Sequence, residues 1–205
     1  MLGHNRRMSG AQCLADMLDG YGVTHVFMVP AVLRRTLAEM ERRTAIKRIL
    51  SRERDAARLA RDVRSMRQLL ASEKGDDDVA DLKNMKGGLV DIDFCAQFLV
   101  LAHAARQGAL LAGSVEATLE AASTHGLLAD ADRKALVKAR ALYTELLQRE
   151  RLRSSEAAPI NWNDPSILRD LGRDLGFASG PALSRAVDAQ RAEVAAIYKR
   201  VVRAD

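Results

Sequence analysis

The chain has 205 residues, of which 48% are hydrophobic and 29% are charged, and its formal net charge is +5. This composition is typical of a globular protein with one or two domains and excludes a low-complexity or disordered chain. Aromatic residues make up only 4%, and there are 4 prolines. Alanine, leucine, arginine and glutamate are abundant, so the composition favours helices over sheets, and we expect a mostly α fold.

Cysteine spacing and hydropathy indicate the compartment. Cys13 and Cys95 are far apart and form no Cys-x-x-Cys motif, so no disulfide framework is indicated. The longest apolar run, residues 94–105, contains Gln97 and His103 and is too short to span a bilayer. The N-terminal residues lack the apolar core of a signal peptide. We therefore predict a soluble cytoplasmic protein without a membrane partner.

The first fifty residues alternate between helical and strand patterns. Residues 9–19 and 31–43 are helical in pattern, while residues 24–29 and 46–50 are short apolar strand candidates. This order predicts the start of an α/β sheet. Because the pattern changes near residue 50, we predict two units, a short α/β fragment over 1–49 and a helical bundle over 50–205.

Positive charge is concentrated in residues 34–67. Arg54, Arg58 and Arg61 recur at helical spacing, which predicts an amphipathic helix over 54–70 with a solvated basic face. The opposite face is apolar and consists of Leu59, Val63, Met66 and Leu70. Aromatic residues do not interleave with the cations, so we predict no nucleic-acid partner. An acidic protein partner is the alternative to a face that is merely solvated.

Further helices are expected in series after a polar loop over 73–78. Helix 91–106 comes first, and then Ser114 caps a helix that runs through Ala122 and is ended by Gly126. A longer helix begins at Asp130 and leads to a loop over 154–163. Prolines then start two more helices. These are Pro165, which follows Asp164, and Pro181, which follows Ser179 and Gly180.

The most distinctive segment is residues 81–104, DLKNMKGGLVDIDFCAQFLVLAHA. Gly87 and Gly88 can adopt positive φ and allow a sharp turn. Asp91 and Asp93 fall in the first turn of the helix that follows, where carboxylates favour the positive end of the helix dipole. Apolar residues then cover so much of the circumference that the helix should be buried.

This segment resembles DLK-x-x-x-GG-[LI]-x-DI-[ED]-F-x-x-Q-[YF]-L, from the C-terminal helical domain of the bifunctional glutamine synthetase adenylyltransferase/adenylyl-removing enzyme. The resemblance covers about residues 52–202, and Asp93 stands where glutamate is usual. It implies a mostly helical domain and a binding role for the signature residues, which we define as Lys83, Gly87, Gly88, Asp91, Asp93 and Gln97. In that family the domain supports an adjoining adenylylating head and helps it respond to glutamine and to the PII signal protein. The implied role is regulation of glutamine synthetase, and so of nitrogen metabolism, through protein binding.

Catalysis by this chain alone is not expected. In the resembled family AMP transfer uses ATP and Mg²⁺ in a separate nucleotidyltransferase domain, with a Gly-Ser turn and an Asp-x-Asp pair on a strand. Here Gly113 and Ser114 are followed by no acidic pair. Asp91 and Asp93 spell Asp-x-Asp, but residues two apart on a helix diverge by about 200°. We therefore predict no catalytic, cofactor-binding or metal-binding residue.

Residues 10–49 resemble the opening of acetolactate synthase-type thiamine diphosphate enzymes, G-A-x-x-L-x-x-x-L-x-x-x-G-V-x-H-V-F-x-V-P. The Gly-Asp-Gly segment that presents Mg²⁺ to the diphosphate is missing, so no thiamine diphosphate site is predicted. Glu53 falls near the position of that family's cofactor-activating glutamate, but its context favours an exposed helix. The two resemblances together indicate a gene fusion.

The histidines and lysines give only weak indications of catalysis or phosphate binding. The four histidines are scattered, with His103 expected in the core or at its edge and His125 at a helix end. Lys83 and Lys86 could meet a phosphate, although exposed lysines are the favoured interpretation. Three hypotheses follow: a module that binds glutamine synthetase, PII or a separate nucleotidyltransferase chain; a catalytically competent remnant of an adenylyltransferase or a thiamine diphosphate enzyme; and a functionless fusion product.

Overall fold

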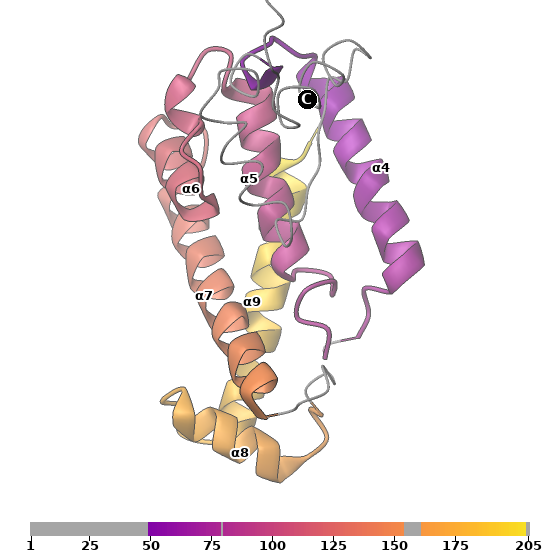
Figure 1. Cartoon of the computed structure of the whole chain (residues 1–205), viewed down its shortest axis with the longest axis vertical. Helices are drawn as coiled ribbons and strands as arrows, with labels where there is room; N and C mark the ends of the chain where they lie inside the picture. Colours follow the sequence, from indigo (N-terminus) through magenta and orange to yellow (C-terminus); the bar gives the residue numbers. More distant parts are fainter. Residues whose placement is uncertain (1–48, 79, 154–160, 204–205) are drawn as a thin grey trace, which may run out of the picture.

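The computed structural model describes residues 49–78, 80–153 and 161–203, and these form a bundle of helices (Figure 1). Its elements are α4 (Ala56–Lys74), α5 (Leu89–His103), the 3-10 helix η1 (Gly108–Leu110), α6 (Val115–Thr124), α7 (Asp130–Arg153), α8 (Pro165–Asp174) and α9 (Gly180–Val201). The described residues contain no strand. The prediction of a mostly α fold with a helical bundle is confirmed.

Most of the predicted α/β fragment lies outside the described residues. Ile49 and Leu50 are described, and both are helical. The strand prediction over 46–50 is therefore wrong at these two positions.

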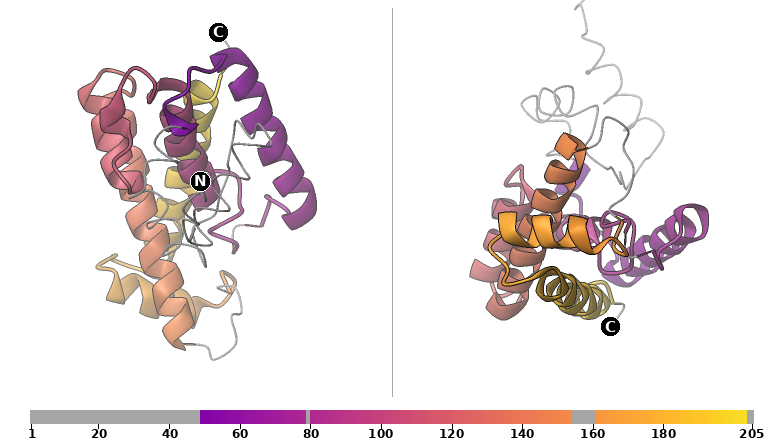
Figure 2. Two further views of the ribbon diagram at one scale, coloured as in Figure 1. Left: turned by 45° about the horizontal axis from the view of Figure 1, so that its top comes forward. Right: turned by 90° about the horizontal axis from the view of Figure 1, so that it is seen from below.

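Helix α5 is the centre of the bundle. It packs against α4, α6, α7 and α9, while α8 packs on α9 across one end. Figure 1 shows α5 between α4 on one side and α6 and α7 on the other, and both views of Figure 2 place α4 at the outer edge. Nine of the fifteen residues of α5 are buried, which confirms the prediction of a buried helix. Within the described ranges, no helix is both long and apolar enough to cross a membrane.

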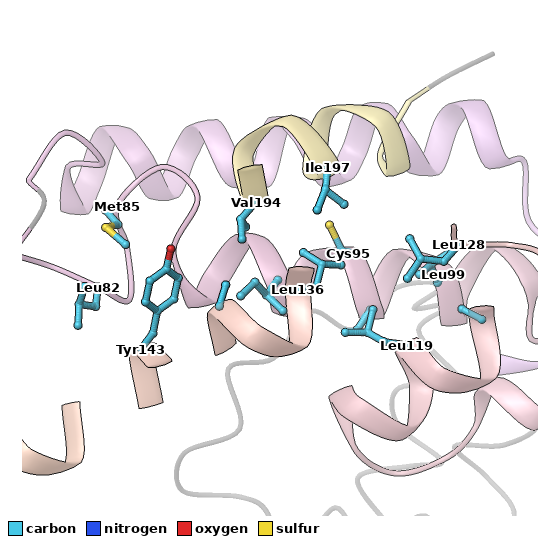
Figure 3. Packing of buried hydrophobic residues seen from close by; sticks show 14 of the residues in the cluster. Leu82, Met85, Cys95, Leu99, Leu119, Leu128, Leu136, Tyr143, Val194 and Ile197 are labelled. Carbon is cyan, nitrogen blue, oxygen red and sulfur yellow. The ribbon is translucent and has the colours of Figure 1, made fainter. Parts of the chain in front are cut away.

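Two apolar clusters hold the helices together. The larger one joins α5, α7 and α9, and Figure 3 shows Cys95 of α5 between Leu136 of α7 and Ile197 of α9. The smaller one, which we call the α4 cluster, joins α4, α5 and the end of α9. Its buried members are Leu59, Ala60, Val63, Val90, Phe94, Phe98, Leu101 and Val202.

The helix starts follow local sequence signals. Ser114 caps α6 through its side chain, and α8 begins at Pro165, both as predicted. The side chains of Asp164 and Ser179 cap α8 and α9, and α9 begins at Gly180, one residue before the predicted start at Pro181. The predicted ends are less accurate, because α4 continues to Lys74 and α5 spans Leu89–His103 instead of 91–106. These differences are small for boundaries inferred from periodicity.

Candidate functional site

The signature residues centre on a tight turn between α4 and α5, which we call the signature turn (residues 81–88). The Asp81 carboxylate accepts hydrogen bonds from the backbone N–H of Lys83 at 3.1 Å and of Asn84 at 2.9 Å. It also accepts one from the Asn84 side-chain amide at 2.7 Å. Leu82 and Met85 of the turn are fully buried in the larger cluster. The turn is therefore anchored both by its own polar groups and by the core.

The two glycines of the turn are needed for different reasons. Gly87 has φ of +81°, and a Cβ there would fall 2.8 Å from the carbonyl carbon of Arg191 on α9 and closer still to its oxygen. Gly88 has φ of −85°, so the expectation of positive φ is wrong for this residue. A Cβ on Gly88 would instead lie 2.7–2.9 Å from three carbonyl oxygens of the same turn. Both positions exclude a side chain because backbone segments approach closely.

The Asp91 carboxylate is the polar centre of the site. It is 2% exposed, and its Oδ1 accepts a 2.5 Å hydrogen bond from Nε of Arg67 on α4. Its Oδ2 accepts a 2.5 Å bond from the backbone N–H of Gly87. Arg67 also donates to the carbonyl of Asn84 at 3.0 Å, and Asp76 lies 3.8 Å away. This buried ion pair joins α4, α5 and the signature turn.

Arg67 is the residue that sequence reasoning missed. It follows Leu59 and Val63 at spacings of four, so it lies on the buried face of α4, although it carries a charge. That spacing was the available signal, because an arginine within an apolar stripe requires a buried counterion. Met66, predicted to belong to the apolar stripe, is instead partly exposed.

Asp93 takes part in a separate ion-pair network. Its carboxylate lies 2.8 Å from Arg140 of α7, and Arg140 also contacts Glu116 of α6 at 2.7 Å. Burial raises the pKa of Asp93, although Arg140 opposes this shift. Asp91 and Asp93 therefore have different partners on different helices. Among the residues the structure describes, no group of three or more His, Cys, Asp or Glu side chains is placed to hold a metal ion.

The other predicted residues do not join this centre. Lys83 and Lys86 are exposed, whereas Gln97 is half-buried on α5. His103 is half-buried, and burial lowers its pKa, which agrees with a position at the edge of the core. His125 is the C-cap of α6, as predicted.

Glu53 is exposed but lies in the connection before α4 and not in a helix, so that prediction is wrong in part. It pairs with Arg106 at 3.2 Å. The basic face of α4 is confirmed for Arg58 and Arg61, which are exposed. Arg54 is instead half-buried, with its guanidinium directed to backbone carbonyls.

Comparisons with known proteins agree with the C-terminal resemblance. A curated bifunctional glutamine synthetase adenylyltransferase/adenylyl-removing enzyme of Rhodopseudomonas palustris (strain BisB5) is 40% identical over 160 residues. That match covers 78% of this chain and 16% of the relative. The protein of the same name from Bradyrhizobium diazoefficiens is 34% identical over 182 residues, which are 88% of this chain and 18% of the relative.

The second match spans 182 of the 205 residues, so it extends into residues 1–49. The acetolactate synthase-type resemblance of that segment stays a prediction. Both matches show that the chain spans about one sixth of the length of these relatives. In addition, the sequence model of the family described as GlnD PII-uridylyltransferase matches residues 64–202, which is more than half of the chain. The chain belongs to the GlnD PII-uridylyltransferase family.

Proposed function

We propose that the chain is a non-catalytic helical module that contributes to the regulation of glutamine synthetase by binding protein. One observation carries the proposal, namely that Asp91 is buried against Arg67 and Asp93 is paired with Arg140. Carboxylates that chelate Mg²⁺ for phosphoryl transfer have to converge on one ion. These two instead connect α5 to different helices, so Asp91 and Asp93 act as scaffold.

A binding module needs exposed groups that a partner can contact. Lys83 and Lys86 are exposed on the signature turn, and Arg58 and Arg61 are exposed on α4. These cations suit an acidic protein surface, because complementary charge raises association rates and selects partners. The proposed partners are glutamine synthetase, the PII protein or a separate nucleotidyltransferase chain.

The test combines two measurements on purified proteins. Radiometric transfer of AMP from ATP to glutamine synthetase is measured with this chain as the only candidate enzyme. Retention of glutamine synthetase and of PII on the immobilised chain is measured in parallel. We expect no labelling and retention of one partner that weakens as salt is raised, since the contact is electrostatic.

A charge reversal identifies the surface involved. Lys83→Glu on the signature turn should lower retention, while Lys138→Glu, at another exposed lysine, on α7, should leave it unchanged. Labelling of glutamine synthetase would contradict the proposal and support an enzyme remnant. The absence of both labelling and retention would support a functionless fusion product.

A further inference from the structure

Tyr143 places a buried hydroxyl where α7, α9 and the signature turn meet. The residue is fully buried, and in Figure 3 its ring lies between Met85 of the turn and Val194 of α9. The hydroxyl is directed away from α7. A hydroxyl in this position has lost its contact with bulk water, so it needs a hydrogen-bond partner inside the protein.

Buried polar atoms of α7 and α9 lack a hydrogen-bond partner in the part of the chain that the structure describes. They include the hydroxyls of Tyr143 and Tyr198 and the Oε1 atom of Gln190. Gln190 is 8% exposed and lies one turn before Val194 on α9, so it is on the same face of that helix. Leaving such groups unpaired costs free energy, and internal water typically bonds to groups that the protein itself does not pair.

Both tyrosine hydroxyls lie within the electrostatic reach of the Asp91 carboxylate. Burial raises the pKa of Tyr143 and of Tyr198, and the negative charge of Asp91 raises both further. The rise in the pKa of Tyr143 is opposed by Arg191. The rise in the pKa of Tyr198 is opposed by Arg67, the ion-pair partner of Asp91. Neither hydroxyl bonds to Asp91 directly. Neighbouring polar groups without a direct bond are the arrangement that a water molecule bridges.

The Asp91 carboxylate can accept further hydrogen bonds. Its two oxygens accept one bond each, from Arg67 and from the backbone N–H of Gly87, whereas an ionised carboxylate offers about four acceptor sites. A ligand at this place has to accept from a tyrosine O–H and donate to a carboxylate, and water does both. A cation would be repelled by the Arg67 guanidinium and an anion by Asp91, so the ligand is neutral.

We propose that internal water bridges the hydroxyls of Tyr143 and Tyr198 to the Asp91 carboxylate. Gln190 Oε1 accepts a hydrogen bond from the same water cluster. The cluster connects α7 and α9 to the ion pair that joins α4, α5 and the signature turn. The inference does not depend on the proposed function, because it concerns the interior of one molecule.

A crystal structure of the full chain, at a resolution that shows ordered water, tests the bridge directly. We expect water density within about 3.2 Å of the Tyr143 hydroxyl oxygen, connected to an oxygen of Asp91 directly or through a second water. The Tyr198 hydroxyl should bond to the same cluster. Either hydroxyl bonded directly to a protein group would overturn the inference, and so would a site without water density.

Urea unfolding of hydroxyl deletions gives a second, independent readout. Tyr143→Phe should lower the midpoint. The matched control Thr118→Val should also lower it, because it removes a buried hydroxyl that bonds directly to the Leu110 carbonyl at 3.3 Å. If no water were bound, Tyr143→Phe would remove only an unpaired hydroxyl, and the midpoint would stay the same or rise. That result would refute the bridge.

Combining Tyr143→Phe with Tyr198→Phe tests whether one cluster serves both hydroxyls. The loss in the double variant should be smaller than the sum of the two single losses, because the first deletion already disrupts the shared water. Additive losses would mean that the hydroxyls bind separate waters, and they would contradict a shared cluster.

Discussion

Replacing Gly87 by alanine tests whether the signature turn is held against α9 by close backbone contact. Gly75→Ala is the matched control. Gly75 has nearly the same dihedral, φ of +78° against +81°, but a Cβ there would meet nothing within 4 Å. Both variants incur the steric cost of positive φ for an alanine, about 1 kcal/mol. Only the Gly87 variant also forces a methyl group against the backbone of Arg191.

The additional cost can be worked out from the structure. To accept a Cβ, the turn and α9 have to separate, which as an overpacking effect costs about 1–3 kcal/mol. The movement also weakens the bond from the Gly87 N–H to the buried Asp91 carboxylate, worth about 1.5–3 kcal/mol for a charged acceptor. We expect Gly87→Ala to lower the free energy of unfolding by about 4 kcal/mol in total.

Urea unfolding followed by far-ultraviolet circular dichroism measures the difference. The midpoint should fall for both variants, and much further for Gly87→Ala, with similar slopes if the transition stays two-state. An equal loss in the two variants would refute the reasoning, because it would mean that the turn does not depend on its contact with α9.

Four further results are expected. Asp91→Asn should lower the free energy of unfolding by about 3 kcal/mol, because it leaves a buried guanidinium without its closest counterion. Asp93→Asn should lower the free energy of unfolding by about 1 kcal/mol at most. If urea unfolding gave the reverse order, the assignment of the buried pair would be contradicted. Arg140→Gln should raise the pKa of Asp93 further, as measured by NMR titration of the carboxyl carbon; an unchanged pKa would exclude the ion pair. Because the pKa of Asp93 is higher in the folded state, its contribution to stability is present below the unfolded-state pKa and is lost as pH rises through the folded-state pKa, and Asp93→Asn should remove this slope. Cys95 in a Cys13→Ser chain should resist thiol reagents until urea unfolds the protein, since burial raises the pKa of the thiol; rapid labelling of the native chain would contradict its burial.

The local features of the fold could be predicted from the sequence. Ser114 was identified as a helix cap, and Pro165 and Pro181 as helix starts to within one residue, because such residues act on backbone groups only a few positions away. The buried character of α5 was also evident, because apolar residues surround it on nearly every side. In each case the determining residues are neighbours in the chain.

The contacts that build the site were not predictable in the same way. Arg67 and Asp91 are 24 residues apart, and Asp93 and Arg140 are 47 residues apart. Their pairing depends on how α4, α5 and α7 pack, which periodicity does not determine. Met66 illustrates the same limit, because its apolar stripe is only partly covered where α4 lies at the edge of the bundle.

The structural contacts of the signature residues also explain why they are poor sites for a functional test, with one exception. A change at Gly87 or Asp91 disturbs the packing of three helices, so a loss of partner binding there would not distinguish a lost contact from a damaged fold. Lys83 belongs to the same turn but is exposed, and its backbone N–H, not its side chain, bonds to Asp81. A charge reversal at Lys83 therefore changes the surface and preserves the turn. If the turn contacts a partner, Lys83 is the signature residue through which that contact can be measured separately from folding.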